Sequence, residues 1–474
     1  MKKWSFFNKK EPFMSKMMFS KVVALLMIIG SFNPVIAGSS ATPQGSETPM
    51  PRLEEVANGD AQFWLYQGPP NNRLMTCNIY YTFNTAVDAD ILLARLKDLV
   101  ASYKMFQRNV VEVDGLPFWQ DAKPDWQQHF RILREGEDIE AWRKQSEIEV
   151  SAPSQVGEGI PHFRAALSPD RRQFIFTWHH VISDYEGMFN KHAKHIFQKK
   201  DERTQYGYQI SGNAAEDRGK KGIIETITSS LGTVVRNVLN TDRPLGFVGT
   251  GFNVQTFVLP VGDRELSILG RKADLPMSDI FSFIALRTIT RYHEMKGETD
   301  DFIAPIVTPL SLRKSSLETD EGNNRAIKTF PLAFPLETVR EMHGRVIGLS
   351  PASSSYDSAG KLLKKVRAWP SIEPLIRRLA MPDYISNYFP LADMRLNIAD
   401  ATLISHHLRV CMVGYERTKF AWSNYNGKVQ LFLHTDPLVV EEELMSQSFR
   451  ETSSEILDYL SQAATGKHSS RMLK

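Results

Sequence analysis

Three residues stand at a spacing suited to proton-transfer chemistry: His179, His180 and Asp184, in the pattern HHxxxD. A neutral imidazole, with an ordinary pKa of about 6.5, can take the proton of a hydroxyl or amine as that group attacks an acyl carbonyl. General-base assistance of this kind is typically worth about 10² to 10⁴ in rate. We interpret His180 as the base, His179 as its catalytic neighbour, and Asp184 as a carboxylate that orders the loop through an arginine.

The same pattern has a plainer interpretation. The two histidines would simply end a strand, and Asp184 would be an ordinary helix cap. The chain contains a second histidine pair, His406 and His407, in which Cys411 occupies the position where the motif requires an aspartate. We interpret that second pair as structural, and the other single histidines as packed or solvated.

A strand and a helix must position the motif. Residues 173–178 alternate between aromatic and other side chains, which is expected of a strand buried on one face. The residues after the motif place apolar side chains on one side of a helix: Phe189, Ala193, Ile196 and Phe197. The motif should therefore lie at a strand-to-helix corner, where a rigid scaffold can present a side chain to a cavity.

The chain length of 474 residues predicts two domains, because one hydrophobic core rarely covers so many. We place an N-terminal subdomain that carries HHxxxD at 53–200, a crossover linker at 201–250 and a C-terminal subdomain at 251–474. Both halves alternate strand-like and helix-like segments, which predicts an α/β fold with layered α+β packing. The clearest strands are 77–83, 254–259 and 428–434, and the clearest helices are 89–104, 441–460 and one between a cap at Ser278 and an end at Gly297.

The linker contains an amphipathic stretch. Its apolar side chains share one helical face: Ile223, Ile224, Ile227, Leu231, Val234, Val235 and Val238. Such a stripe is typical of a helix that bridges two domains, and also of a helix that makes peripheral contact with a membrane.

Composition and charge limit the classes of molecule that the chain is expected to bind. The chain has 57 Lys and Arg against 54 Asp and Glu, a net charge of +3, which argues against a nucleic-acid binder. Cys77 and Cys411 are far apart, and neither belongs to a CxxC or histidine-rich cluster, so we expect no metal site. Export would allow a disulfide between them, but their spacing does not bring them together.

The first residues resemble a targeting segment. Six lysines precede an apolar stretch at 22–29, and small residues follow at 35–37. We interpret 1–37 as a signal peptide or N-terminal anchor and 38–52 as a flexible lead-in. This predicts an exported or membrane-associated protein on the periplasmic or extracytosolic side, or a cytoplasmic protein if the start is misassigned.

Several segments resemble the bacterial wax ester synthase/diacylglycerol acyltransferase family. This family lies within the chloramphenicol acetyltransferase-like superfamily, which shares HHxxxDG and includes nonribosomal condensation domains. The likeness spans roughly residues 53–460. Besides the motif, it rests on Asp60, Ala61 and Phe63 (DAxF), the basic block 106–108, Gly187 and Met188, the segment 309–313 (PxSLR), Gly322 and Asn323 (GN), and Ser386 and Asn387 (the start of SNVPGP).

The resemblance implies two chloramphenicol acetyltransferase-like subdomains with an active-site tunnel at their interface. It also implies an acyl-CoA or other acyl thioester as co-substrate, a hydrophobic alcohol or diacylglycerol as acceptor, and no bound cofactor. Gly187, Arg313 and Asn387 would contact substrate. Arg108 would form the salt bridge to Asp184, with Arg313 as the other candidate.

The chain departs from the family pattern at three places. Ser278 stands where the family usually has the asparagine of an ND pair, which leaves only Asp279. Tyr185 replaces the glycine after Asp184, where a glycine permits positive φ angles that tyrosine adopts reluctantly. Tyr388 and Phe389 interrupt the SNVPGP-like segment. Two alternatives to an O-acyltransferase therefore stay open: a condensation-type N-acyltransferase, and a non-catalytic relative that binds a lipid or a partner.

Overall fold

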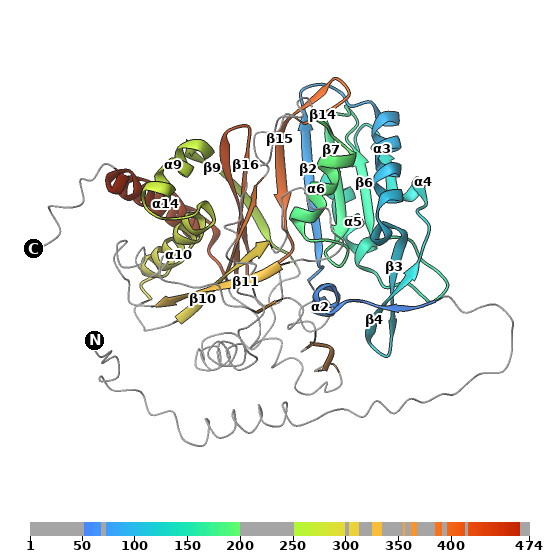
Figure 1. Cartoon of the computed structure of the whole chain (residues 1–474), viewed down its shortest axis with the longest axis horizontal. Coiled ribbons are helices and arrows are strands. Elements are labelled where there is room, and N and C mark those ends of the chain that lie inside the picture. Colours follow the sequence, from blue (N-terminus) through green and yellow to red (C-terminus); the bar gives the residue numbers. More distant parts are fainter. Residues whose placement is uncertain are drawn as a thin grey trace, which may run out of the picture. The chain divides into compact units, whose positions relative to one another are not determined.

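The computed structural model describes residues 52–67, 73–199, 251–298, 303–311, 325–333, 354–355, 361–367 in part, 384–390, 396–412 and 416–464 (Figure 1). The predicted leader at 1–37, nearly all of the lead-in and the whole crossover at 201–250, with its amphipathic stretch, lie outside the described residues, as does Arg313. Among the described residues, no helix is both long enough and apolar enough to cross a bilayer.

The HHxxxD motif is positioned by a mixed sheet. This first sheet is antiparallel except where its two strands β5 and β6 run parallel. In spatial order its described strands are β5 (Phe130–Ile132), β6 (Phe163–Leu167), β7 (Gln173–His179), β2 (Thr76–Phe83), β15 (Ala401–Arg409), β14 (Leu396–Ile398) and β8 (Gln198–Lys199).

Two strands of the first sheet come from the C-terminal half of the chain. β15 runs antiparallel to β2, with Arg409 opposite Asn78 and Leu403 opposite Phe83. Figure 1 shows orange β15 beside blue β2. The predicted division into 53–200 and 251–474 is therefore too simple, because it separates strands that a single sheet joins.

The second sheet is also mixed, since β13 runs parallel to both β10 and β16. Its described strands, in spatial order, are β12 (Ser354–Ser355), β11 (Arg325–Ala333), β10 (Ile303–Ser311), β13 (Tyr384–Pro390), β16 (Thr418–Tyr425), β17 (Lys428–Thr435) and β9 (Asn253–Gly262). A small third sheet has the order β1 (Glu54–Glu55), β4 (Leu116–Asp121) and β3 (Arg108–Val113).

Helices pack beside these sheets where their apolar faces predict burial. In α3 the carboxylate of Asp88 accepts the first free amides of the helix, and Leu92, Leu96 and Leu99 are buried along one face. The described helices are α2 (Asn58–Tyr66), α3 (Ala89–Ser102), the 3₁₀ turn η1 (Lys104–Gln107), α4 (Trp126–His129), α5 (Ile139–Ser151), α6 (Tyr185–His195), α9 (Asp263–Lys272), α10 (Met277–Met295) and α14 (Glu442–Ala464).

The helix expected between Ser278 and Gly297 is α10, and only one of its predicted ends is right. Gly297 has a φ of +69° just past the helix, as a C-terminal glycine should. The predicted cap is wrong, because Pro276 precedes the first turn and Ser278 already lies inside the helix. A proline fits this position, since the first amides of a helix have no intrahelical partner.

A buried ion pair joins the segment before β2 to the segment after β17. The Arg73 guanidinium pairs with the Asp436 carboxylate and donates a second hydrogen bond, of 2.9 Å, to the Glu416 carbonyl. Arg73 and Asp436 are essentially inaccessible to solvent. Removing one partner would leave an uncompensated charge in the interior, which is far more costly than losing an exposed pair.

We predict that Arg73→Ala lowers the free energy of unfolding by about 3–5 kcal/mol. The matched control is Arg291→Ala, which removes the half-exposed pair between Arg291 and Glu451 and should cost less than about 1 kcal/mol. Urea denaturation of the full chain measures both values. Equal losses in the two variants would contradict the role given to the buried pair.

Candidate active site

The predicted strand-to-helix corner is present, and the β2–β7 ladder continues through it. Thr76 lies opposite His179, and the next amide, of His180, donates to the Met75 carbonyl at 2.7 Å. The Ile182 amide then donates to the His179 carbonyl at 3.1 Å, which turns the chain toward α6. Backbone hydrogen bonds thus fix the position of the His180 main chain, from which the imidazole extends.

His179 is locked in place by both ring nitrogens. Nδ1 accepts the Val181 amide at 3.0 Å, so the ring proton resides on Nε2, which donates to the Gln67 side-chain oxygen at 3.0 Å. The ring is fully buried, and burial lowers its pKa well below the ordinary value. A neutral ring with two occupied nitrogens can brace the corner but has no lone pair left for a substrate proton.

His180 is held differently, by stacking. Its ring lies 3.7 Å from that of Phe63 at an interplanar angle of 13°, and the residue is 8% exposed. Phe63 belongs to α2, within the segment that resembles DAxF. The stacking fixes the plane of the imidazole, which a proton acceptor with a defined orientation requires.

Asp184 is the N-cap of α6. Its carboxylate accepts the Gly187 amide at 2.8 Å, and the residue is 3% exposed. The predicted salt bridge to Arg108 is wrong. Arg108 begins β3 and pairs instead with Glu54 and Asp121, because its strand belongs to the small third sheet rather than to the motif corner.

The three predicted substrate-binding residues differ in their surroundings. The Gly187 amide is already engaged by the Asp184 cap, so it does not face a substrate with a free donor. Asn387 lies in β13, opposite Ala421 of β16, and its side-chain oxygen is buried with no hydrogen-bond partner within the described ranges. Arg313 lies outside the described residues.

The departures from the family pattern touch each other. Tyr185 takes up ordinary helical geometry as the first residue of α6, so no positive φ is needed there and the expected strain does not arise. Its buried ring packs on Trp178 and on Phe389, with centroids 5.3 and 4.8 Å apart. Tyr185 and Phe389 therefore act as one packing unit that joins the motif corner to β13.

Both cysteines lie beside His180, which their spacing in the sequence did not predict. Cys77 donates its S–H to Cys411 across 3.9 Å, and one ligand-type atom of each cysteine and of His180 lies within 4.8 Å of the others. Burial raises the pKa of Cys77, whereas the hydrogen bond from Cys77 and the nearby Lys419 ammonium lower the pKa of Cys411. The strand pairing that unites them spans more than 300 residues of sequence, which local periodicity cannot reveal.

The second histidine pair is engaged in contacts between strands. His406 bonds the Ser423 hydroxyl at 2.9 Å and His407 bonds the Thr256 hydroxyl at 3.2 Å, which links β15 to β16 and β9. On α6, His192 bonds the Tyr81 hydroxyl. These contacts agree with the structural interpretation.

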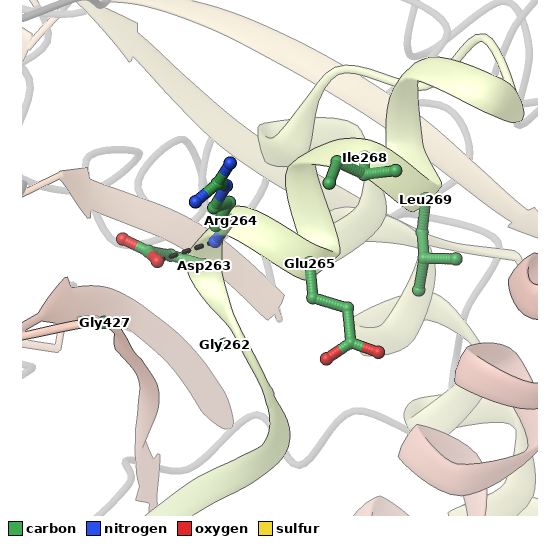
Figure 2. A pocket seen from close by; sticks show the side chains of 7 residues that line it. All are labelled: Gly262, Asp263, Arg264, Glu265, Ile268, Leu269 and Gly427. Atoms are coloured by element: carbon green, nitrogen blue, oxygen red, sulfur yellow. Dashed lines mark hydrogen bonds between the residues drawn. The ribbon is translucent and has the colours of Figure 1, made fainter.

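A separate surface hollow lies at the start of α9. The hollow has a volume of about 650 Å³ and contains none of the predicted site residues. Figure 2 shows the side chains that line it. Asp263 is already bonded there to the Arg264 amide. Its lining residues are Gly262, Asp263, Arg264, Glu265, Ile268, Leu269 and Gly427.

Comparisons with known proteins identify the fold. No family profile and no curated protein matches the sequence. Solved structures do: the starter condensation domain of rhizomide synthetase RzmA matches with a TM-score of 0.58 and 14% identity, over 87% of this chain and 95% of that chain. The first condensation domain of the CDA synthetase gives 0.53 and 13%, over 87% and 96%.

A third solved structure is the wax ester synthase/diacylglycerol acyltransferase from Marinobacter aquaeolei VT8. It matches with a TM-score of 0.51 and 14% identity, over 86% of this chain and 100% of that chain. Identities of this size establish the fold alone. They confirm the predicted two-subdomain, chloramphenicol acetyltransferase-like architecture, the fold of condensation domains and of this acyltransferase.

We predict that Asp184→Ala lowers the free energy of unfolding by about 1–2 kcal/mol and reduces soluble yield, because it removes the cap of α6. Asp184→Asn keeps a capping oxygen and should retain most of the stability. Asp138→Ala removes the exposed cap of α5 and serves as a remote control. Wild-type stability of Asp184→Ala in chemical denaturation would contradict the bracing role.

The buried histidines predict a pH dependence of stability. Burial lowers the pKa of His129 and of His162 to about 4, and that of His406 to about 3. Below about pH 6.5 the unfolded chain binds protons that the folded chain excludes, so stability present above this pH is lost as pH falls toward 4. Each such histidine contributes a slope of up to about 1.4 kcal/mol per pH unit.

Denaturation midpoints at pH 7.5, 6 and 5 measure this slope. The window lies above the range in which most carboxylates titrate, so histidines dominate it. Equal stability at pH 7.5 and 5 would show that these rings take up protons in the folded protein.

Proposed function

We propose that the chain is an O-acyltransferase, which moves a long-chain acyl group from a thioester to the hydroxyl of a fatty alcohol or diacylglycerol. The main support for the proposal is that the two histidines of the β7–α6 corner have different roles. His179 has both ring nitrogens bonded and so holds the corner in place, and the ring of the adjacent buried His180 is oriented by stacking on Phe63. A fold of the same kind in a wax ester synthase/diacylglycerol acyltransferase supports it.

The chemistry needs one proton acceptor. The His180 imidazole takes the hydroxyl proton as the acceptor oxygen bonds to the thioester carbonyl carbon. When the tetrahedral intermediate collapses, the carbon–sulfur bond breaks and the imidazolium returns the proton to the leaving thiolate. One ester bond replaces one thioester bond, and His180 ends in its starting state.

Other residues position this base. His179 and Asp184 act as positioning residues, since one fixes the end of β7 and the other fixes the start of α6. Asn387 is the candidate polar contact to substrate, because a buried oxygen with no partner among the described residues is costly unless a ligand satisfies it.

The identity of the acyl donor depends on the cellular compartment in which the chain acts. Acyl-CoA is the donor that we propose if the chain remains in the cytoplasm, and complexes of the rhizomide synthetase condensation domain with C8-CoA support a thioester of this class. If residues 1–37 direct export, the donor is another thioester or a lipid ester. Determining the N-terminal residue of the mature protein decides between these cases.

We predict that His180→Ala reduces ester formation by about 10²- to 10⁴-fold without a matching change in stability, because it removes a general base. The assay supplies labelled acyl-CoA with long-chain alcohols, diacylglycerol or amines. His407→Ala is the matched control, since His407 is also the second histidine of a pair but lies on β15, and it should keep wild-type activity.

The products distinguish the alternatives. Ester formation that is lost in His180→Ala supports the proposal. Amide formation from the amine panel identifies a condensation-type N-acyltransferase instead, and ligand binding with no turnover identifies a non-catalytic relative. Ester formation that persists in His180→Ala would show that another group acts as the base.

A further inference from the structure

The two cysteines of the chain and His180 come from three adjacent strands of the first sheet. His180 follows β7, Cys77 lies in β2, and Cys411 follows β15. All three are buried, and their ligand-type atoms lie within 4.8 Å of one another. We propose that Cys77, Cys411 and His180 form a binding site for Zn²⁺, with a fourth position open to a small ligand.

The spacing fits a tetrahedral ion. Zinc–sulfur bonds of about 2.3 Å at tetrahedral angles separate two sulfur ligands by about 3.8 Å. The Sγ atoms of Cys77 and Cys411 are 3.9 Å apart, so the pair already has the separation that the ion requires. The strand register explains why His180 joins them: His180 continues β7 opposite Met75, and Cys77, two residues further along β2, points to the same face.

The ligand chemistry also fits. Two thiolates and a neutral imidazole form a familiar zinc ligand set, and they offset the charge of a divalent cation in a buried site. The nearby Lys419 ammonium adds no uncompensated charge, because it pairs with the Glu416 carboxylate at 3.4 Å.

An outer partner is available. The Tyr185 hydroxyl is buried at the start of α6, beside the corner that carries His180, and has no hydrogen-bond partner within the described part of the chain. A hydroxyl in this position can donate to a metal-bound thiolate, as outer partners of metal ligands commonly do.

The consequence for activity rests on the proposed function. An ion bound to His180 occupies the lone pair that the general base needs, so the zinc-bound and catalytic states exclude each other. Zinc should therefore inhibit ester formation, and a chelator should restore it.

Cobalt is a direct probe, because thiolate–cobalt bonds give charge-transfer absorption in the near ultraviolet. The chain has only two cysteines, so any such band reports on Cys77 and Cys411 alone. We expect the reduced full chain to bind one equivalent of Co²⁺ with a tetrahedral thiolate spectrum that Zn²⁺ displaces. Cys77→Ser, Cys411→Ser and His180→Ala should each weaken binding by more than the roughly 10- to 100-fold typical of losing an outer partner, and Tyr185→Phe by about that amount.

Circular dichroism checks that each variant folds, and the three single ligand variants provide independent tests if one of them does not. Absence of a thiolate–cobalt band in the folded wild-type chain, or a band unchanged in folded His180→Ala, would overturn the site. Failure of the acyltransferase assay leaves the binding result standing, so the two proposals fail separately. Zinc that binds at this site while ester formation continues undiminished would overturn the inhibitory consequence.

Discussion

The corner between β7 and α6 depends on one constraint, the immobilisation of His179. Its ring accepts a hydrogen bond from the Val181 amide and donates one to Gln67, the residue just past α2. One side chain thus connects the end of β7, the turn that follows it and the end of a helix that is distant in the sequence. Because burial keeps this ring neutral, the tautomer that makes both bonds persists across the physiological pH range. The bonded His179 therefore fixes the backbone from which His180 extends, and stacking on Phe63 fixes the plane of the His180 ring.

Two residues at this corner that depart from the family pattern pack against each other. Tyr185 stands where the family pattern has glycine, yet it takes helical geometry and packs on Phe389, itself a departure from the pattern. A bulky residue on α6 and one on β13 thus fill one shared space. The same corner receives Cys411 because β15 returns to pair with β2, which joins the C-terminal half of the chain to the sheet that carries the motif.

Local features of the sequence predicted local structure well. The strand predicted before the motif is β7, and the helix predicted after it is α6. The predicted strands at 77–83 and 428–434 are β2 and β17. These predictions succeed because alternation and helical spacing depend only on residues that are close in the sequence. Contacts between distant segments were not predictable. Arg108 pairs with Glu54 in the third sheet, and Cys77 meets Cys411 through a long-range strand pairing. The family resemblance predicted the two-subdomain fold, which residue spacing alone could not.

The most direct test of this account is nitrogen-15 NMR of the full chain labelled at histidine, with His179 assigned by its absence from a His179→Gln variant. We predict that His179 stays neutral from pH 8 to pH 5 with its proton on Nε2. Protonation of His179 near the ordinary pKa of about 6.5, or a proton on Nδ1, would contradict the claim that this ring fixes the corner.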